Sequence, residues 1–205
     1  FNHYADFLHT MLHGWGIWIF RITMLVALAL HILATIQLTA ANRASRPSRY
    51  QHDATMVASR SSRMMIWSGL TVLVFFVFHI LHYTVRVQED LRLLAEHKQN
   101  WAMTIAGFQN LFVVLFYILS MALLCSHLSH GVASIFQTLG LRTKKTAPAV
   151  QLFSKAYSII IFVGFISIPI SVYFFGYGKK EMEATKAMVE AKADACPADD
   201  SECSH

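Results

Sequence analysis

Five histidines lie within long apolar segments of this 205-residue chain. They are His31, His79, His82, His127 and His130. One buried histidine alone is more often a hydrogen-bonded packing residue than a ligand. Ionisable side chains inside a membrane are costly, however, and usually serve a function there. Because neutral imidazole is a common metal ligand, this excess predicts a metal or metal-cofactor site inside an apolar bundle.

Three of these histidines are expected at two depths. His31 stands ten residues before Ala41 and His127 thirteen residues before Gly140, near the predicted ends of two spans that run in the same direction. His79 stands sixteen residues after Arg63, on a span that runs the opposite way. With a rise of about 1.5 Å per residue, His31 and His127 share one layer, and His79 lies in a second layer about 15–20 Å away.

Imidazoles that approach from facing helices at one depth suit the axial ligation of haem iron, which helical bundles hold in this way. Two such layers suit a pair of b-type haems that carry electrons across a membrane. The i,i+3 pairs His79/His82 and His127/His130 also fit a non-haem metal centre. A di-iron centre of that kind would want carboxylates, and the predicted spans contain none.

Other residues of the spans have two interpretations each. Gly69, Gly107, Gly131 and Gly164 either let a planar macrocycle approach the backbone or simply permit close helix packing. Arg21, near the outer end of its span, either reaches the membrane surface or pairs with a haem propionate.

The elements that must position these residues are membrane helices. The chain is 55% hydrophobic and 14% charged, whereas about a quarter of the residues of a soluble domain are charged. Four stretches reach the length of about 20 apolar residues that a span requires. They are residues 15–41, 64–86, 103–139 and 156–177. We predict an all-α integral membrane bundle over residues 1–177, followed by a surface helix and flexible tail over 178–205.

Basic residues predict the topology. Loops 42–63 and 141–155 are rich in Arg and Lys and are expected in the cytoplasm, with residues 86–100 and the C-terminal tail on the outer side. Because these basic residues flank spans, the net charge of +5 does not indicate a nucleic-acid partner. Cys196 and Cys203 in the tail either pair in an oxidising compartment or stay free thiols.

Four motifs of the chain resemble a known family. They are Phe1-Asn2 with the aromatic stretch after it, Asn42-Arg43-Ala44-Ser45-Arg46-Pro47 after His31, Arg63-Met-Met-Ile-Trp-Ser-Gly69 leading to Phe78-His79, and His127-Leu-Ser-His-Gly-Val-Ala-Ser-Ile-Phe-Gln-Thr-Leu-Gly140. Together they resemble the cytochrome b subunit of succinate dehydrogenase, also found as fumarate reductase, in its single-anchor, two-haem form. The resemblance extends to about residue 177, and its most specific motif begins at His127.

The resemblance implies five membrane helices, of which the first has no counterpart here, so we expect the sequence to begin late. It implies that His31 and His127 bind the cytoplasmic-side haem b and that His79 binds the outer one. His82, His130 and Arg21 would then support the ligands or the propionates.

The same resemblance implies partners and a location. The chain would anchor a flavoprotein that oxidises succinate and an iron–sulfur protein, and would relay their electrons to menaquinone or another quinone in a bacterial cytoplasmic membrane. A higher oligomer of this complex is possible for the family. The enzyme activity would belong to the complex, and this chain would be its non-flavin, electron-transfer subunit.

Three other functions stay open at this point. One is the di-haem cytochrome b anchor of a hydrogenase or formate dehydrogenase. Another is a non-haem metalloenzyme that uses the two His-x-x-His pairs. The third is a structural or transport bundle with packed histidines.

Overall fold

The computed structural model describes residues 2–45 and 64–195. Over these residues the chain is helical and contains no strand. Four helical segments are long and apolar enough to cross a membrane: Asn2–Ala44, Met65–Val85, Leu111–Thr138 and Ala147–Phe174. The prediction of an all-α chain with four such helices is therefore confirmed. The chain divides into two units, Phe1–Val57 and Ala58–His205, and each is described by itself.

The first unit is one long helix with a short helix before it. Helix α1 (Asn2–Thr10) and the 3-10 turn η1 (Met11–Gly14) precede α2 (Trp15–Ala44), which carries His31. Residues Leu12 and His13 are left-handed, with φ of 51° and 55°, and Gly14 follows with φ of 86°. These three residues separate α1 from α2, so the segment before the first span is helical and not a plain loop.

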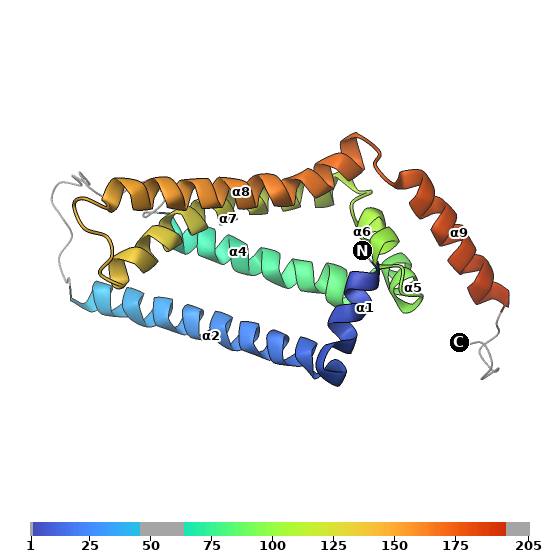
Figure 1. The fold of residues 1–205 in the computed structure, drawn as a ribbon, viewed down its shortest axis with the longest axis horizontal. Helices are drawn as coiled ribbons and strands as arrows, with labels where there is room; N and C mark the ends of the chain where they lie inside the picture. The colour runs from blue at the N-terminus through green and yellow to red at the C-terminus, as the bar shows by residue number, and fades with distance from the viewer. Residues whose placement is uncertain (1, 46–63, 196–205) are drawn as a thin grey trace. The chain divides into compact units, whose positions relative to one another are not determined.

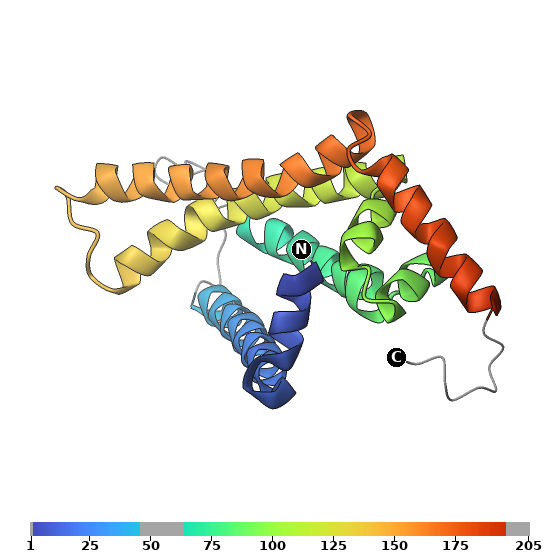
Figure 2. The same ribbon diagram turned by 45° about the vertical axis from the view of Figure 1, so that its right-hand side comes forward.

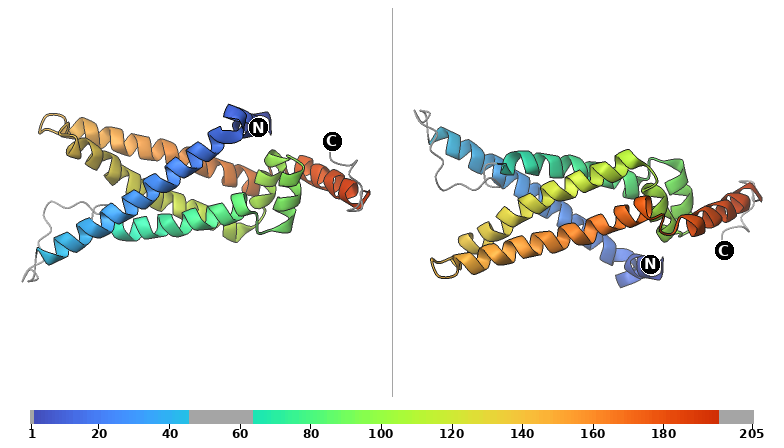
Figure 3. Two further views of the ribbon diagram at one scale, coloured as in Figure 1. Left: turned by 90° about the horizontal axis from the view of Figure 1, so that it is seen from below. Right: turned by 90° about the horizontal axis from the view of Figure 1, so that it is seen from above.

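Three long helices form the body of the second unit (Figure 1). Helix α4 (Met65–His79) continues into a π-helical turn, η2 (Ile80–Val85). Helix α7 (Leu111–Thr138) packs against α4 on one side and α8 (Ala147–Phe174) on the other, and Figure 3 shows it between them. Each neighbouring pair is antiparallel, so residues near the start of α4 face residues near the end of α7.

Small polar residues allow α8 to pack closely. Ser154 and Ser158 are both buried, one helical turn apart. Ser154 donates its hydroxyl proton to the Val150 carbonyl, and Ser158 donates to the Ser154 carbonyl, each at 2.7 Å. Because each hydroxyl is satisfied within its own helix, the buried stripe costs little polar desolvation and lets helix backbones approach.

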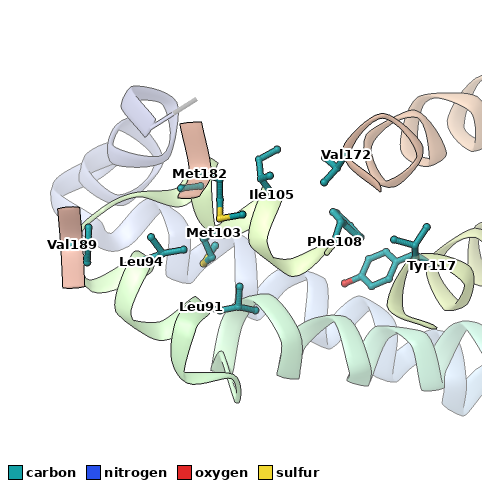
Figure 4. Close-up of a cluster of buried hydrophobic side chains, with 11 residues drawn as sticks. Leu91, Leu94, Met103, Ile105, Phe108, Tyr117, Val172, Met182 and Val189 are labelled. Carbon is teal, nitrogen blue, oxygen red and sulfur yellow. The ribbon is translucent and has the colours of Figure 1, made fainter. Parts of the chain in front are cut away.

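Three shorter helices lie at one end of this unit, and together we call them the cap (Figure 2). They are α5 (Glu89–Glu96), α6 (Asn100–Gly107) and α9 (Lys179–Ala195). Leu91 and Leu94 of α5, with Met182 and Val189 of α9, are buried against apolar residues of α6. Figure 4 shows that this buried cluster continues through Phe108 to Tyr117 of α7. The cap is thus continuous with the core of the long helices.

An ion pair and a tight turn fix α9 to the cap. Lys186 donates to the Asp90 carboxylate of α5 at 2.6 Å, and this hydrogen bond raises the pKa of Lys186 above its ordinary value. Gly178, with φ of 72°, lies between α8 and α9. A side chain there would approach the Trp101 ring within 2.8 Å, so both the conformation and the contact favour glycine.

Two predicted spans have different limits in the structure. The segment predicted as one helix over 103–139 is divided, because Asn110 is extended and its side chain accepts from the amides of Phe112 and Val113 at the start of α7. The last span begins at Ala147 and not near residue 156, since Pro148 suits the first helical turn. The predicted loop 141–155 therefore includes more than two turns of α8.

The expected outer loop over 86–100 contains α5 and the first residue of α6. Helix α5 is amphipathic, with buried leucines three residues apart and charged residues on its other face. Its overall composition is therefore polar. The surface helix predicted over 179–193 is present as α9. Loop 42–63 lies mostly outside the described residues, as do Cys196 and Cys203 of the predicted flexible tail.

Candidate functional site

Two histidines of α4 and η2 share one hydroxyl group of α7. The Nδ1 atoms of His79 and His82 each lie 3.1 Å from the hydroxyl oxygen of Tyr117. His82 is buried, with 6% of its surface exposed, whereas the His79 side chain is exposed on the helix surface. We call His79, His82 and Tyr117 the Tyr117 layer. Of its two histidines, His79 is the one that a cofactor beside the helices could reach.

Aromatic rings fix the position of the Tyr117 hydroxyl. The Tyr117 ring meets Phe75 and Phe108 edge to face, with centroids 5.0 and 4.9 Å apart. Tyr83 packs on His82 with ring centroids 4.3 Å apart, but its own hydroxyl donates to the Thr104 carbonyl at 3.2 Å. Edge-to-face packing of this kind adds to the energy of burial and restricts the rings. The Tyr117 hydroxyl is thus held where both imidazoles meet it.

The π-helical turn η2 brings His82 to this position. Within η2 the backbone is wider than in an α-helix, and the turn ends where Arg86 adopts a left-handed conformation with φ of 59°. Single π-helical turns are rare and often lie at functional sites. The sequence pattern does not predict this turn, and it indicates neither Tyr117 nor Tyr83 as part of a site.

In the second layer the histidine comes from α7 and the hydroxyl from α4, the reverse of the Tyr117 layer. Here the histidine is His127 of α7, and its Nδ1 lies 3.2 Å from the Ser68 hydroxyl of α4. Ser68 also donates to the Met65 carbonyl at 3.1 Å. The His127 ring lies against Gly69, where an added Cβ would be 3.3 Å from the ring carbon Cε1. We call Ser68, Gly69 and His127 the Ser68 layer.

Proton counting assigns the form of His127. A serine hydroxyl has one proton, and a carbonyl can only accept. When the Ser68 hydroxyl donates to the Met65 carbonyl, its oxygen is left to accept from His127, and the His127 proton then lies on Nδ1 with the lone pair on Nε2. That is the tautomer of a histidine that ligates a metal through Nε2 while its other nitrogen donates to a fixed partner.

The two layers are well separated along the helices. Ser68 precedes His79 by eleven residues on α4, and Tyr117 precedes His127 by ten residues on α7. At about 1.5 Å per residue, both helices give a separation of about 15–17 Å. His79 and His127 therefore lie at different levels along α4 and α7, and the residue counts on the two helices give similar separations.

The structure locates the remaining predicted residues without joining them to either layer. His31 lies on α2, in the other unit, so its distance from His127 is not defined. Arg21 lies over the ring of Trp18, 5.3 Å from its centroid, on the same helix. His130 is half-buried on α7, one turn beyond His127.

The four glycines of the predicted spans have different surroundings, which bear on whether each permits helix packing or the approach of a macrocycle. Gly107 packs against the Tyr83 hydroxyl, so it permits close packing within the protein. Gly69 lacks a side chain and so leaves room for the ring of His127, a candidate ligand. At Gly131 and Gly164 an added Cβ would meet no described atom within 4 Å.

Among the described residues, no three His, Cys, Asp or Glu side chains gather closely enough to hold a metal ion by themselves. Haem iron needs far fewer protein ligands, because the macrocycle supplies four nitrogens and each helix supplies one imidazole. His79 and His127 fit that requirement, since each has its Nδ1 held by a hydroxyl of the facing helix. Each of these two imidazoles is therefore held as a single axial ligand would be.

Comparison of the chain with protein-family models, with curated proteins and with solved structures finds no match.

Proposed function

We propose that this chain is the membrane-anchor cytochrome b subunit of a succinate:quinone oxidoreductase. The observation that carries the proposal is the repeated hydrogen bond: at two depths, a histidine of one helix has its Nδ1 bonded to a hydroxyl of the helix that faces it. Metal-ligating histidines almost always have such a partner, which fixes the ring and its tautomer. The resemblance of the segments around His79 and His127 to that family adds support.

The resemblance would pair His31 with His127 as the ligands of one haem b and would make His79 a ligand of the other. Bound haem b would supply a one-electron carrier. The protein's own residues hold the imidazoles in place, and the apolar helices keep water away from them. A separation of about 15–17 Å between the layers suits electron transfer from one side of a membrane toward the other.

The charge distribution supports an orientation. Arg142, Lys144 and Lys145 lie in the short turn between α7 and α8, at the end of the unit opposite the cap. Segments rich in Lys and Arg usually stay in the cytoplasm. The Ser68 layer would then lie nearer the cytoplasm, where the flavoprotein and the iron–sulfur protein would dock, and the Tyr117 layer nearer the outer side.

The test is a count of haem b per copy of this chain in the purified complex, by the pyridine haemochrome spectrum, together with identification of the soluble subunits that co-purify. We expect two haems, a flavoprotein and an iron–sulfur protein, with reduction of the haems by succinate. Hydrogenase or formate dehydrogenase subunits in their place would favour the other di-haem anchors. A colourless complex would contradict haem binding and favour a structural bundle or a non-haem centre.

A further inference from the structure

The Tyr117 layer contains one hydroxyl between two imidazoles. Tyrosine has a single hydroxyl proton, so Tyr117 can donate to only one of the two Nδ1 atoms, and the other must donate to it. At least one of the two histidines therefore has its proton on Nδ1, and at most one accepts there. Where one donates and the other accepts, the two histidines differ in which nitrogen could bind iron.

Burial distinguishes the two histidines. The Nε2 atom of His82 is buried and has no hydrogen-bond partner among the described residues. His79, in contrast, is exposed on the surface of α4. A planar macrocycle beside the helices could reach an imidazole on that surface, but could not reach His82 Nε2 without displacing the aromatic rings around it.

From these contacts we propose that Tyr117 is a positioning residue that selects His79 as the haem ligand and tunes its strength. His79 donates its Nδ1 proton to the Tyr117 oxygen and keeps its lone pair on Nε2, where it would be available to haem iron. Tyr117 in turn donates to His82 Nδ1, which keeps the Tyr117 hydroxyl turned away from His79. His82 supports the ligand through Tyr117 and does not bind iron itself.

This inference rests on the proposed function, since it requires a haem at His79. An acceptor on Nδ1 makes a ligating imidazole more electron-rich, which favours ferric over ferrous iron. Removal of the Tyr117 hydroxyl should therefore weaken ferric binding more than ferrous binding, and the midpoint potential of that haem should rise. The loss of such a partner commonly costs about tenfold or more in affinity. A tenfold differential loss corresponds to about 59 mV for a one-electron couple.

The experiment compares Tyr117→Phe with Tyr83→Phe in the intact purified complex, by redox titration of the haem spectrum. Tyr83 is a matched control, because its ring packs on His82 while its hydroxyl bonds to the Thr104 carbonyl and to neither histidine. We expect Tyr117→Phe to keep both haems and to raise the potential of one by about 59 mV. The other haem, in the Ser68 layer, and both haems of Tyr83→Phe should titrate as in the wild type.

A second variant keeps the test decisive if Tyr117→Phe does not fold. His82→Ala leaves the Tyr117 hydroxyl in place, so it should retain both haems and shift the same potential by less than Tyr117→Phe does. Loss of the outer haem in His82→Ala would show that His82 is the ligand and would overturn the inference. Equal potentials in Tyr117→Phe and Tyr83→Phe would also overturn it, while two haems in the wild type would leave the proposed function intact. A wild-type complex without haem would instead contradict the proposed function itself.

Discussion

The Tyr117 layer and the Ser68 layer contain the same kind of hydrogen bond in different surroundings. In the Tyr117 layer the hydroxyl belongs to a buried residue whose ring is packed among other aromatic side chains and whose cluster continues into the cap. In the Ser68 layer the hydroxyl belongs to a small residue, and the histidine ring lies on a glycine of the facing helix. Aromatic packing fixes the Tyr117 layer. The Ser68 layer is fixed by the close approach of the His127 ring to the facing helix.

This difference determines how each imidazole can be perturbed. The Ser68 hydroxyl forms hydrogen bonds with the Met65 carbonyl of its own helix and with one histidine. The Tyr117 hydroxyl forms hydrogen bonds with two histidines. A substitution at one histidine therefore alters the hydrogen bond of the other. We therefore expect substitutions in the Ser68 layer to act on one ligand alone, and substitutions in the Tyr117 layer to be coupled.

The largest effect should come from removal of the ligands themselves. On the proposed function His127→Ala should lower the haem content from two to one per chain, and His31→Ala should remove the same haem, because the resemblance would make each residue an axial ligand of the same iron. His79→Ala should spare that haem and remove the other. The measurement is haem b per chain with a redox titration that identifies which haem remains.

His130→Ala is the matched control, since His130 lies one turn beyond His127 on the same helix and should leave both haems in place. Loss of different haems in His31→Ala and His127→Ala would exclude their pairing.

A smaller effect should follow removal of the Ser68 hydroxyl. Ser68→Ala removes the hydrogen bond between the Ser68 hydroxyl and His127 Nδ1, so the ring is held less firmly. We expect haem affinity in the Ser68 layer to fall about 10-fold to 100-fold, with the haem at His79 unchanged. Haem retention during dilution of the purified complex measures the difference.

Ser158→Ala provides the control for this substitution. It removes an equally buried serine hydroxyl whose hydrogen bond stays within α8. If Ser158→Ala and Ser68→Ala retain haem equally well, Ser68 contributes only packing. An effect of Ser68→Ala on both haems would contradict the independence of the Ser68 layer.

Hydropathy and charge predicted the helices well, because burial of apolar side chains in lipid requires long uncharged helices whatever their neighbours are. The limits of those helices depend on single residues that hydropathy does not register. Asn110 divides an apolar stretch by capping α7, and Pro148 starts α8 before its sequence becomes strongly apolar. The two leucines of α5 are too few to predict a packed helix from sequence alone.

The candidate site was predictable only in part. The depths of His79 and His127 follow from their distance to the helix ends, since a helix has a constant rise. A signal for their partners was present as well: Ser68 and Tyr117 stand about the same number of residues before His79 and His127 on antiparallel spans. The π-helical turn η2 had no such signal, because it depends on how His82 and Tyr83 pack against α6 and α7.

The smallest effect should arise in the cap, which adjoins only the Tyr117 layer. Lys186→Met removes the ion pair that holds α9 on α5, so α9 should open about twice as often, as expected for a partly exposed pair. The rate of subtilisin cleavage within α9 measures this opening, with Lys192→Met as control, because no ion pair of Lys192 is found among the described residues.

The pH dependence of that effect has a definite sign. The pKa of Lys186 is raised in the folded protein, so its contribution to stability is complete below the ordinary lysine pKa of about 10.4 and is lost as the pH rises through the folded value. The difference between wild type and Lys186→Met should hold from pH 7 to about 10 and then decline, vanishing only above the raised pKa of folded Lys186. Should the difference persist at higher pH, the loss of the methylene packing of Lys186 and not of its charge would account for the opening of α9.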